Sequence, residues 1–303
     1  MATKPFWRKA ASVLIAAPSG LPGRSFDYKL CFVRRAESAR LFPRSLVFPG
    51  GKMEESDLAL ARQLAREHED VDLMAAKICA VREVAEETGI LLGHEASTVP
   101  IAERSNFPFT PRSLRSAVDV LQPFCTWLSP EYIAASPQGG FETNFFVAIL
   151  PAPPTGTPAA DGEEVTEIRW MSPADAVKAA DDARFPFPQL YMLGELMGCH
   201  KRLLLASFVL RLHRGLFRYP FKPFRFNTVD DKCIFVLPGD HQHPIYRPIK
   251  FSGLEHRGLF EGTDFRNSKW SLSRSDELVR IASSAGEADL DWCSYQLGNN
   301  SKL

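Results

Sequence analysis

The segment from Arg82 to Ile90 combines a predicted apolar helix face with a cluster of glutamates on the opposite face. With successive residues about 100° apart around a helix, Glu83, Glu86 and Glu87 fall within an arc of roughly 100°. The opposite side carries apolar side chains that would face a core: Ile78, Val81, Val84 and Ala85. This helix therefore has to pack on a hydrophobic core and leave three carboxylates at its other edge.

Three neighbouring carboxylates repel one another, and a bound cation removes that cost. Oxygen ligands of this kind favour Mg²⁺ or Mn²⁺. An isolated Glu-Glu pair would more simply be a solvated acidic face. Here Gly50 and Gly51 follow Phe48-Pro49 at the end of a predicted strand, and glycine lets the backbone approach a ligand closely. We therefore predict a divalent metal site between the helix and this glycine turn.

Apolar patterns along the chain predict an α+β or α/β sandwich, with strands around one long helix and further helices after it. Strands are expected in five segments: 11–16, 28–34, 124–128, 142–150 and 165–171. Helices are expected in four: 57–68, 73–88, 173–180 and 189–210. We place this domain at residues 8–215. Residues 216–303 are predicted to be a C-terminal extension packed on the core, helical and irregular except for a strand at 232–237.

The composition argues against two classes of partner. The 36 Lys and Arg residues balance the 36 Asp and Glu residues, so no overall charge favours nucleic acid or an anionic membrane. The longest apolar runs are too short to cross a bilayer of roughly 30 Å. Six cysteines occur without a Cys-x-x-Cys pair and no apolar signal peptide opens the chain, which fits a reducing compartment. We expect neither nucleic acid nor membrane as a partner.

Together, the glycine turn and the glutamate helix resemble the Nudix box, Gly-x5-Glu-x7-Arg-Glu-U-x-Glu-Glu-x-Gly-U, where U is aliphatic. Every position from Arg82 to Ile90 matches the second half of the box. The first half departs twice when Gly51 is aligned with the box glycine. Asp57 replaces the first box Glu, and its spacing to Arg82 exceeds the standard by seventeen residues. Residues 58–73 are therefore expected to be an insertion that packs aside. The resemblance implies a diphosphatase and a Nudix fold, which is an α+β architecture with a mixed sheet sandwiched between helices.

The Nudix resemblance also implies a set of metal ligands. Glu83, Glu86 and Glu87 would bind Mg²⁺ or Mn²⁺ and act in catalysis, and the Gly50 carbonyl would be a backbone ligand. Glu142, which opens the predicted strand at 142–150, is our expected fourth acidic ligand. In this interpretation the metal neutralises charge on the leaving phosphate and activates the attacking water.

Two further roles follow from the same resemblance. Arg82 would orient a carboxylate, that of Asp57 or Glu83, rather than contact the substrate. A carboxylate would remove the proton of the attacking water. The alternatives for this general base are a box glutamate, Glu142, and Glu163 or Glu164 in the loop before the strand at 165–171.

A second signature upstream of the glycine turn resembles the coenzyme A diphosphatase branch of the Nudix family. Arg35, Ala36, Arg40 and residues 48–51 match it, whereas Cys31-Phe32-Val33 and Arg44 depart from it. Because coenzyme A carries a 3'-phosphate that needs cations, the residues expected to bind substrate are Arg35, Arg40, Gly51 and Lys52.

The expected reaction is hydrolysis of coenzyme A or acyl-coenzyme A to 3',5'-ADP and (acyl-)4'-phosphopantetheine. One alternative is a Nudix pyrophosphatase of NADH or ADP-ribose, which would use the same box residues. Another is a catalytically inactive Nudix module that binds a nucleotide or a protein. Retention of all three box glutamates argues against that inactive module, because an acidic cluster without a metal costs stability.

The last three residues, Ser301, Lys302 and Leu303, form the tripeptide that the peroxisomal import receptor reads at a free C-terminus. The polar residues before it would leave the signal accessible. We therefore expect this receptor to be a partner and the peroxisomal matrix to be the location of the protein.

Overall fold

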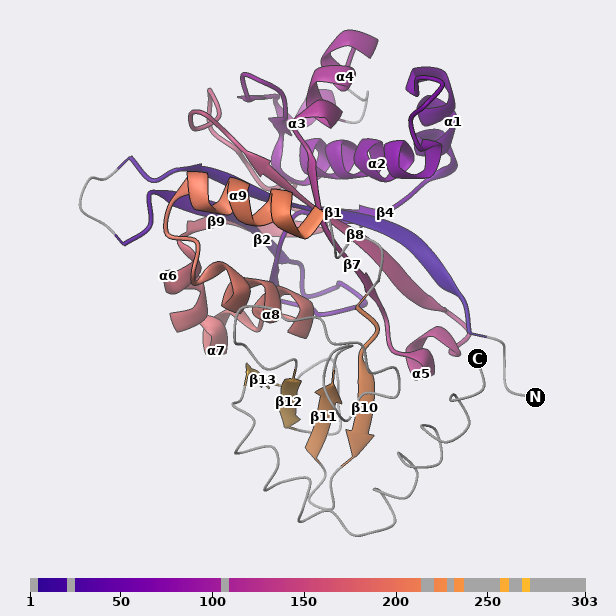
Figure 1. Cartoon of the computed structure of the whole chain (residues 1–303), viewed down its shortest axis with the longest axis vertical. Helices are drawn as coiled ribbons and strands as arrows, with labels where there is room; N and C mark the ends of the chain where they lie inside the picture. The colour runs from indigo at the N-terminus through magenta and orange to yellow at the C-terminus, as the bar shows by residue number, and fades with distance from the viewer. Residues whose placement is uncertain are drawn as a thin grey trace.

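The computed structural model describes residues 5–20, 25–104, 109–213, 221–227, 232–236, 257–261 and 269–272. Its centre is a mixed seven-stranded sheet of order β3-β2-β1-β8-β7, with β4 paired to β1 and β9 paired to β2 (Figure 1). β1 is parallel to β8, and the other pairs are antiparallel. The strands are β1 (Trp7–Pro18), β2 (Tyr28–Arg35), β3 (Leu46–Val47), β4 (Gly50–Lys52), β7 (Gln122–Leu128), β8 (Gly140–Ile149) and β9 (Val165–Met171).

Helices cover both faces of this sheet (Figure 1). Alternation along β1 sends Val13 and Ile15 to one face and Leu14 and Ala16 to the other. The first face is covered by α1 (Glu55–Leu64), α2 (Val71–Thr88) and α4 (Pro111–Asp119). The second is covered by α6 (Pro173–Lys178), α7 (Ala180–Ala183), α8 (Phe187–Leu196) and α9 (Arg202–His213). The predicted α+β fold with a mixed sheet between helices is confirmed.

The glutamate helix is α2, and capping sets both of its ends. The Asp70 side chain accepts hydrogen bonds from the backbone N–H groups of Asp72 and Leu73, which begins the helix. Gly89 ends it in the left-handed conformation, with φ of 73°, and donates to the Ala85 carbonyl at 2.8 Å. These caps place the glutamates in the last two turns of α2.

The predicted insertion at 58–73 comprises most of α1, the connection after it and the first turn of α2. Ala61 of α1 is fully buried in the same cluster as Ile78 of α2. As expected, the insertion therefore packs aside against the helix layer, and the glycine turn keeps its contact with α2.

Two parts of the chain differ from the sequence-based expectation. The single helix expected at 189–210 is two helices, α8 and α9, separated by a turn that contains Gly198. The described part of the C-terminal extension is a four-stranded antiparallel sheet instead of helical and irregular structure, and β13 lies against α8. Its strands are β10 (Phe224–Asn227), β11 (Lys232–Val236), β12 (Arg257–Glu261) and β13 (Lys269–Leu272).

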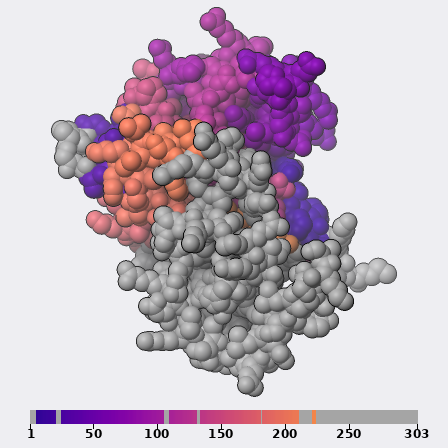
Figure 2. Space-filling model, viewed as in Figure 1, coloured from indigo at the N-terminus to yellow at the C-terminus, as the bar shows by residue number. Residues whose placement is uncertain are grey.

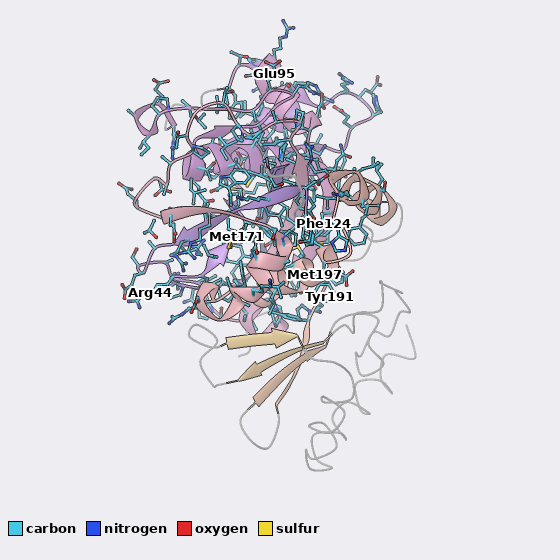
Figure 3. The ribbon with its side chains drawn as sticks, turned by 90° about the vertical axis from the view of Figure 1, so that its left-hand side faces the viewer. Arg44, Glu95, Phe124, Met171, Tyr191 and Met197 are labelled. Carbon is cyan, nitrogen blue, oxygen red and sulfur yellow. The ribbon has the colours of Figure 1, made fainter. Side chains whose placement is uncertain are left out.

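The remaining short elements lie around the layers: β5 (Ile90–Leu91), β6 (Ser97–Thr98), α3 (Ile101–Arg104) and α5 (Glu131–Ala134). In the part of the chain that the structure describes, no helix has the length and apolar character of a membrane span. Figure 2 shows α9 at the surface in orange, and three of its leucines are exposed: Leu203, Leu204 and Leu210. Figure 3 shows Glu95 near the top of the molecule, Phe124 of β7 at mid-height and Tyr191 of α8 below it, and these two aromatic residues belong to the core cluster under α6 to α9.

Candidate active site

The Phe48–Gly51 turn is fixed by the neighbouring strand β1. The Ser12 hydroxyl donates to the Pro49 carbonyl at 3.0 Å, and the Val13 N–H donates to the same oxygen at 2.9 Å. Gly50 has φ of 152°, and a side chain there would collide with the backbone oxygen of Ala11. The turn therefore requires glycine at this position, because only glycine combines that backbone conformation with so close an approach.

This turn contacts the glutamates of α2 directly. The backbone N–H of Gly50 donates to Oε2 of Glu87 at 2.9 Å. A side chain at Gly51 would collide with the carboxylate of Glu83. The structure thus brings together the glycine turn and the glutamate helix, the two halves of the sequence motif.

The guanidinium of Arg82 bridges three carboxylates, those of Asp57, Glu83 and Glu86. Its guanidinium makes two hydrogen bonds of 3.0 Å to Asp57 and one of 2.8 Å to Oε2 of Glu86. The same side chain lies 3.0 Å from Oε1 of Glu83 and donates to the Lys52 carbonyl at 3.0 Å. Both carboxylates that the sequence offered as partners of Arg82, those of Asp57 and Glu83, contact its guanidinium, and the contact with Asp57 forms despite the insertion at 58–73.

Burial and neighbouring negative charges raise the pKa of all three glutamates. For Glu83, burial together with the charges of Glu86 and Glu164 raises the pKa to about 7, although Arg82 opposes the shift. Burial, followed by the charge of Glu83, raises the pKa of Glu87 well above its usual range. Burial also raises the pKa of the more exposed Glu86. Too little positive charge therefore lies near these carboxylates to stabilise their ionised forms, and a bound cation would supply it.

A pocket of about 660 Å³ opens over these side chains. Among the described residues, seven carboxylates line it: Glu54, Glu83, Glu86, Glu87, Asp161, Glu163 and Glu164. Three cationic side chains line it as well: Arg35, Lys52 and Arg82. An anionic diphosphate would be repelled by this excess of carboxylates, so the residues fit a pocket that takes its substrate together with a divalent cation.

The carboxylates of the three box glutamates, Glu83, Glu86 and Glu87, each contact a donor group of the protein. Nη1 of Arg82 contacts Glu83 and Glu86, while the Gly50 N–H holds Glu87. Within the described ranges, no three His, Cys, Asp or Glu side chains form a ready-made metal site. To bind a cation, the carboxylates would therefore have to reorient from these donors.

Sequence comparison decides the family. The NUDIX domain matches residues 8–191, which is more than half of the chain. This chain belongs to the Nudix family. It is therefore a Nudix hydrolase, and the family generally uses divalent metals.

Curated relatives extend the match beyond the Nudix domain. The acyl-coenzyme A diphosphatase NUDT19 of Gallus gallus is 28% identical, covering 78% of this chain and 80% of the relative. The protein of the same name from Xenopus laevis is 25% identical, covering 80% and 82%. A crystal structure of a Nudix hydrolase from Alicyclobacillus acidocaldarius matches with a TM-score of 0.53 at 22% identity, over 71% of this chain and 99% of that one. That similarity shows the fold.

The structure brings only some of the sequence-predicted substrate and metal residues to the Nudix pocket. Arg35, Gly51 and Lys52 line it, whereas Arg40 is exposed and lies outside its lining. Glu142, the expected fourth ligand, is also outside the lining and pairs with Lys9 at 2.6 Å. Glu142 is thus not placed with the box glutamates, because its neighbours Phe141 and Thr143 face the pocket and alternation along β8 directs it away.

Acidic residues from the loop before β9 come close to the box instead. Glu163 and Glu164, two of the expected alternatives for the base, both line the pocket. Asp161 organises this loop, because its Oδ1 accepts from the backbone N–H groups of Glu163 and Glu164 at 2.6 and 2.7 Å. The charge of Glu164 contributes to the raised pKa of Glu83, and both residues line the pocket.

Several site residues carried no sequence signal. Ser12 supports the glycine turn, and buried Arg104 of α3 donates to the Glu86 carbonyl at 3.1 Å near the end of α2. Asp161 could have been suggested by its position before Gly162, since Asp in such a turn often accepts from the following backbone. Nothing in the local sequence pattern could have predicted Ser12 or Arg104, because their roles depend on tertiary contacts.

Proposed function

We propose that this Nudix hydrolase cleaves the diphosphate linkage of coenzyme A or acyl-coenzyme A, giving 3',5'-ADP and (acyl-)4'-phosphopantetheine. The observation that carries the proposal is the contact of Glu83 and Glu87 with the glycine turn, inside a ligand-sized pocket that Glu86 also lines. Support for the substrate class comes from relatives named acyl-coenzyme A diphosphatase and from Arg35, a signature residue that lines the pocket.

Mg²⁺ or Mn²⁺ is the proposed cofactor, held by Glu83, Glu86 and Glu87 with the carbonyl of Gly50. All of these are oxygen donors, as such cations prefer. When bound, the cation would neutralise diphosphate oxygens and lower the pKa of the attacking water. Arg82 has a positioning role, since its contacts with Asp57 and Glu86 fix where the carboxylates lie.

The chain itself has to supply the proton acceptor. Water adds through its oxygen to one phosphorus, the bridging P–O bond breaks, and a carboxylate takes the proton. We propose Glu164 for this role, with Glu163 as the alternative, because both line the pocket and the charge of Glu164 contributes to raising the pKa of Glu83. Arg35 and Lys52 are the cations available for the substrate's phosphates.

The first test is product analysis with the full chain. Purified protein would be incubated with Mg²⁺ or Mn²⁺ and with coenzyme A, acetyl-coenzyme A, NADH or ADP-ribose, and the products separated by chromatography. We expect 3',5'-ADP from the two coenzyme A substrates and none with Glu86→Gln. AMP from NADH or ADP-ribose alone would reject the coenzyme A assignment and favour the pyrophosphatase. Absence of any turnover would favour a binding module.

We also propose import into peroxisomes through Ser301, Lys302 and Leu303, which lie outside the described residues. A fluorescent protein fused to the N-terminus should co-localise with a peroxisomal marker. The same fusion without Leu303 should stay outside these organelles. Equal distribution of the two fusions would reject the proposal.

A further inference from the structure

The pocket has two chemically different ends. One end holds the box glutamates and all three cationic side chains of the described lining, Arg35, Lys52 and Arg82. The other is built from β7, β8, α5 and the start of α8 and is lined by apolar side chains: Trp127, Leu128, Pro130, Ile133, Phe141 and Phe187. A substrate held by its diphosphate at the first end would extend an uncharged portion into the second.

Gln189 is the polar exception at the apolar end. It lies in the first turn of α8, lines the pocket and is only 9% exposed. Its side-chain oxygen Oε1 is buried and has no hydrogen-bond partner in the structure. A buried acceptor without a partner costs stability. A ligand with an N–H group in the pocket would remove that cost after a rotation of the carboxamide that turns Oε1 towards the pocket.

We propose that the apolar end binds the acyl-pantetheine arm of the substrate, and that Gln189 accepts a hydrogen bond from an amide N–H of that arm. This inference rests on the proposed function and names the residue that selects the uncharged half of the substrate. Pantetheine carries two amides on an otherwise flexible chain, so its N–H groups match the unpaired Gln189 oxygen. An acyl chain beyond it would contact Ile133 and its apolar neighbours.

Charge and packing favour this orientation over the reverse. The 3',5'-phosphorylated adenosine half needs cations, and no Lys or Arg of the described lining belongs to the apolar end. The aromatic rings there already pack on one another, since Trp127 stacks on Phe221 at 5.0 Å and meets Phe187 edge-on at 5.8 Å. The nucleotide is therefore placed beside Arg35 and Lys52, and the pantetheine arm towards Gln189.

Gln189→Met tests the amide contact, because methionine has a similar shape and no carboxamide. With the full-length protein, KM for coenzyme A should rise about tenfold and kcat should change little, as expected for one lost hydrogen bond. Inhibition by 3'-phospho-ADP, which has the diphosphate and no pantetheine, should be unchanged. Gln122→Met is the matched control, since Gln122 is exposed and outside the pocket lining.

A second pair of variants tests the acyl chain. Ile133→Ser should lower kcat/KM for octanoyl-coenzyme A about fivefold relative to free coenzyme A. Ile101→Ser, at a residue that is 51% exposed, should leave this ratio unchanged.

Each result has a distinct meaning. If the wild type cleaves coenzyme A and Gln189→Met has the same KM, the inference is wrong and the proposed function stands. Weaker inhibition of Gln189→Met by 3'-phospho-ADP would place the nucleotide at the apolar end and overturn the orientation. If the wild type does not cleave coenzyme A, both proposals fail.

Discussion

Arg82 holds the carboxylate of Asp57 through two parallel hydrogen bonds, from Nε to Oδ1 and from Nη2 to Oδ2, each 3.0 Å long. Both side chains are buried, and Asp57 is only 1% exposed. The pair connects α1 to α2 across the box insertion. Asp57 also accepts from the backbone N–H of Glu54 at 2.9 Å, which fixes the start of α1.

Asp57→Asn should lower the free energy of unfolding by about 3 kcal/mol, because it leaves the buried guanidinium of Arg82 without its main counter-charge. Denaturant unfolding of both proteins measures the change. The matched control is Asp119→Asn, which removes an exposed partner of Arg115 and should cost less than about 1 kcal/mol. Equal losses in the free energy of unfolding would show that the buried pair stabilises the protein no more than the exposed pair does.

Gly51→Ala should damage catalysis more than folding. The new methyl group would collide with the Glu83 carboxylate, which can move only by leaving its place at the turn. A misplaced carboxylate should lower kcat about a hundredfold, while the melting temperature changes little. Gly198→Ala is the control, because no atom lies within 4 Å of its new methyl group. Wild-type kcat for Gly51→Ala would contradict the role of this contact.

The helix and its glutamates could be predicted from the sequence because helical periodicity and capping are local properties. The spacing from Arg82 to Glu87 fixes which side chains share a face, whatever surrounds them. The position of Glu142, outside the pocket lining, could not be predicted in the same way. A strand pattern gives alternation, but which of its two faces lines the pocket depends on packing with other elements.

The C-terminal extension shows a similar limit. The strand expected at 232–237 is present as β11, but its partners β10 and β12 are recognised only through pairing. β12 begins about twenty residues after β11 ends, and a single sequence carries no signal for such a pairing. Phe221, which precedes β10, likewise stacks on Trp127 of the pocket lining, and this contact joins residues that lie far apart in the sequence.

Removal of divalent metal should make stability depend on pH. Burial and neighbouring charges raise the pKa of Glu83 from 4.5 to about 7 in the folded protein. The folded state then binds this proton more tightly than the unfolded chain, so stability is highest below about pH 4.5 and decreases as the pH rises to about 7. A cation binds the deprotonated carboxylates, so stabilisation by Mg²⁺ should increase over the same range.

Melting temperatures in EDTA and in Mg²⁺, measured between pH 4.5 and 8, check this linkage. Glu83→Gln has no titrating group at this position. The difference between its melting temperatures in EDTA and in Mg²⁺ should therefore vary less with pH than that of the wild type. A difference that is independent of pH in the wild type would mean that metal does not bind these carboxylates.

The proposed base can be separated from Glu142 by three matched substitutions. Glu164→Gln keeps the shape of the side chain and removes its basicity, so kcat should fall about a hundredfold with little change in KM. If Glu164 is the base, kcat should fall less in Glu163→Gln than in Glu164→Gln. Glu142→Gln should have near-wild-type kcat, because Glu142 pairs with Lys9 outside the pocket lining. A large loss in Glu142→Gln with normal activity in Glu164→Gln would assign the role to Glu142 of β8, which is one of the alternatives that the sequence left open.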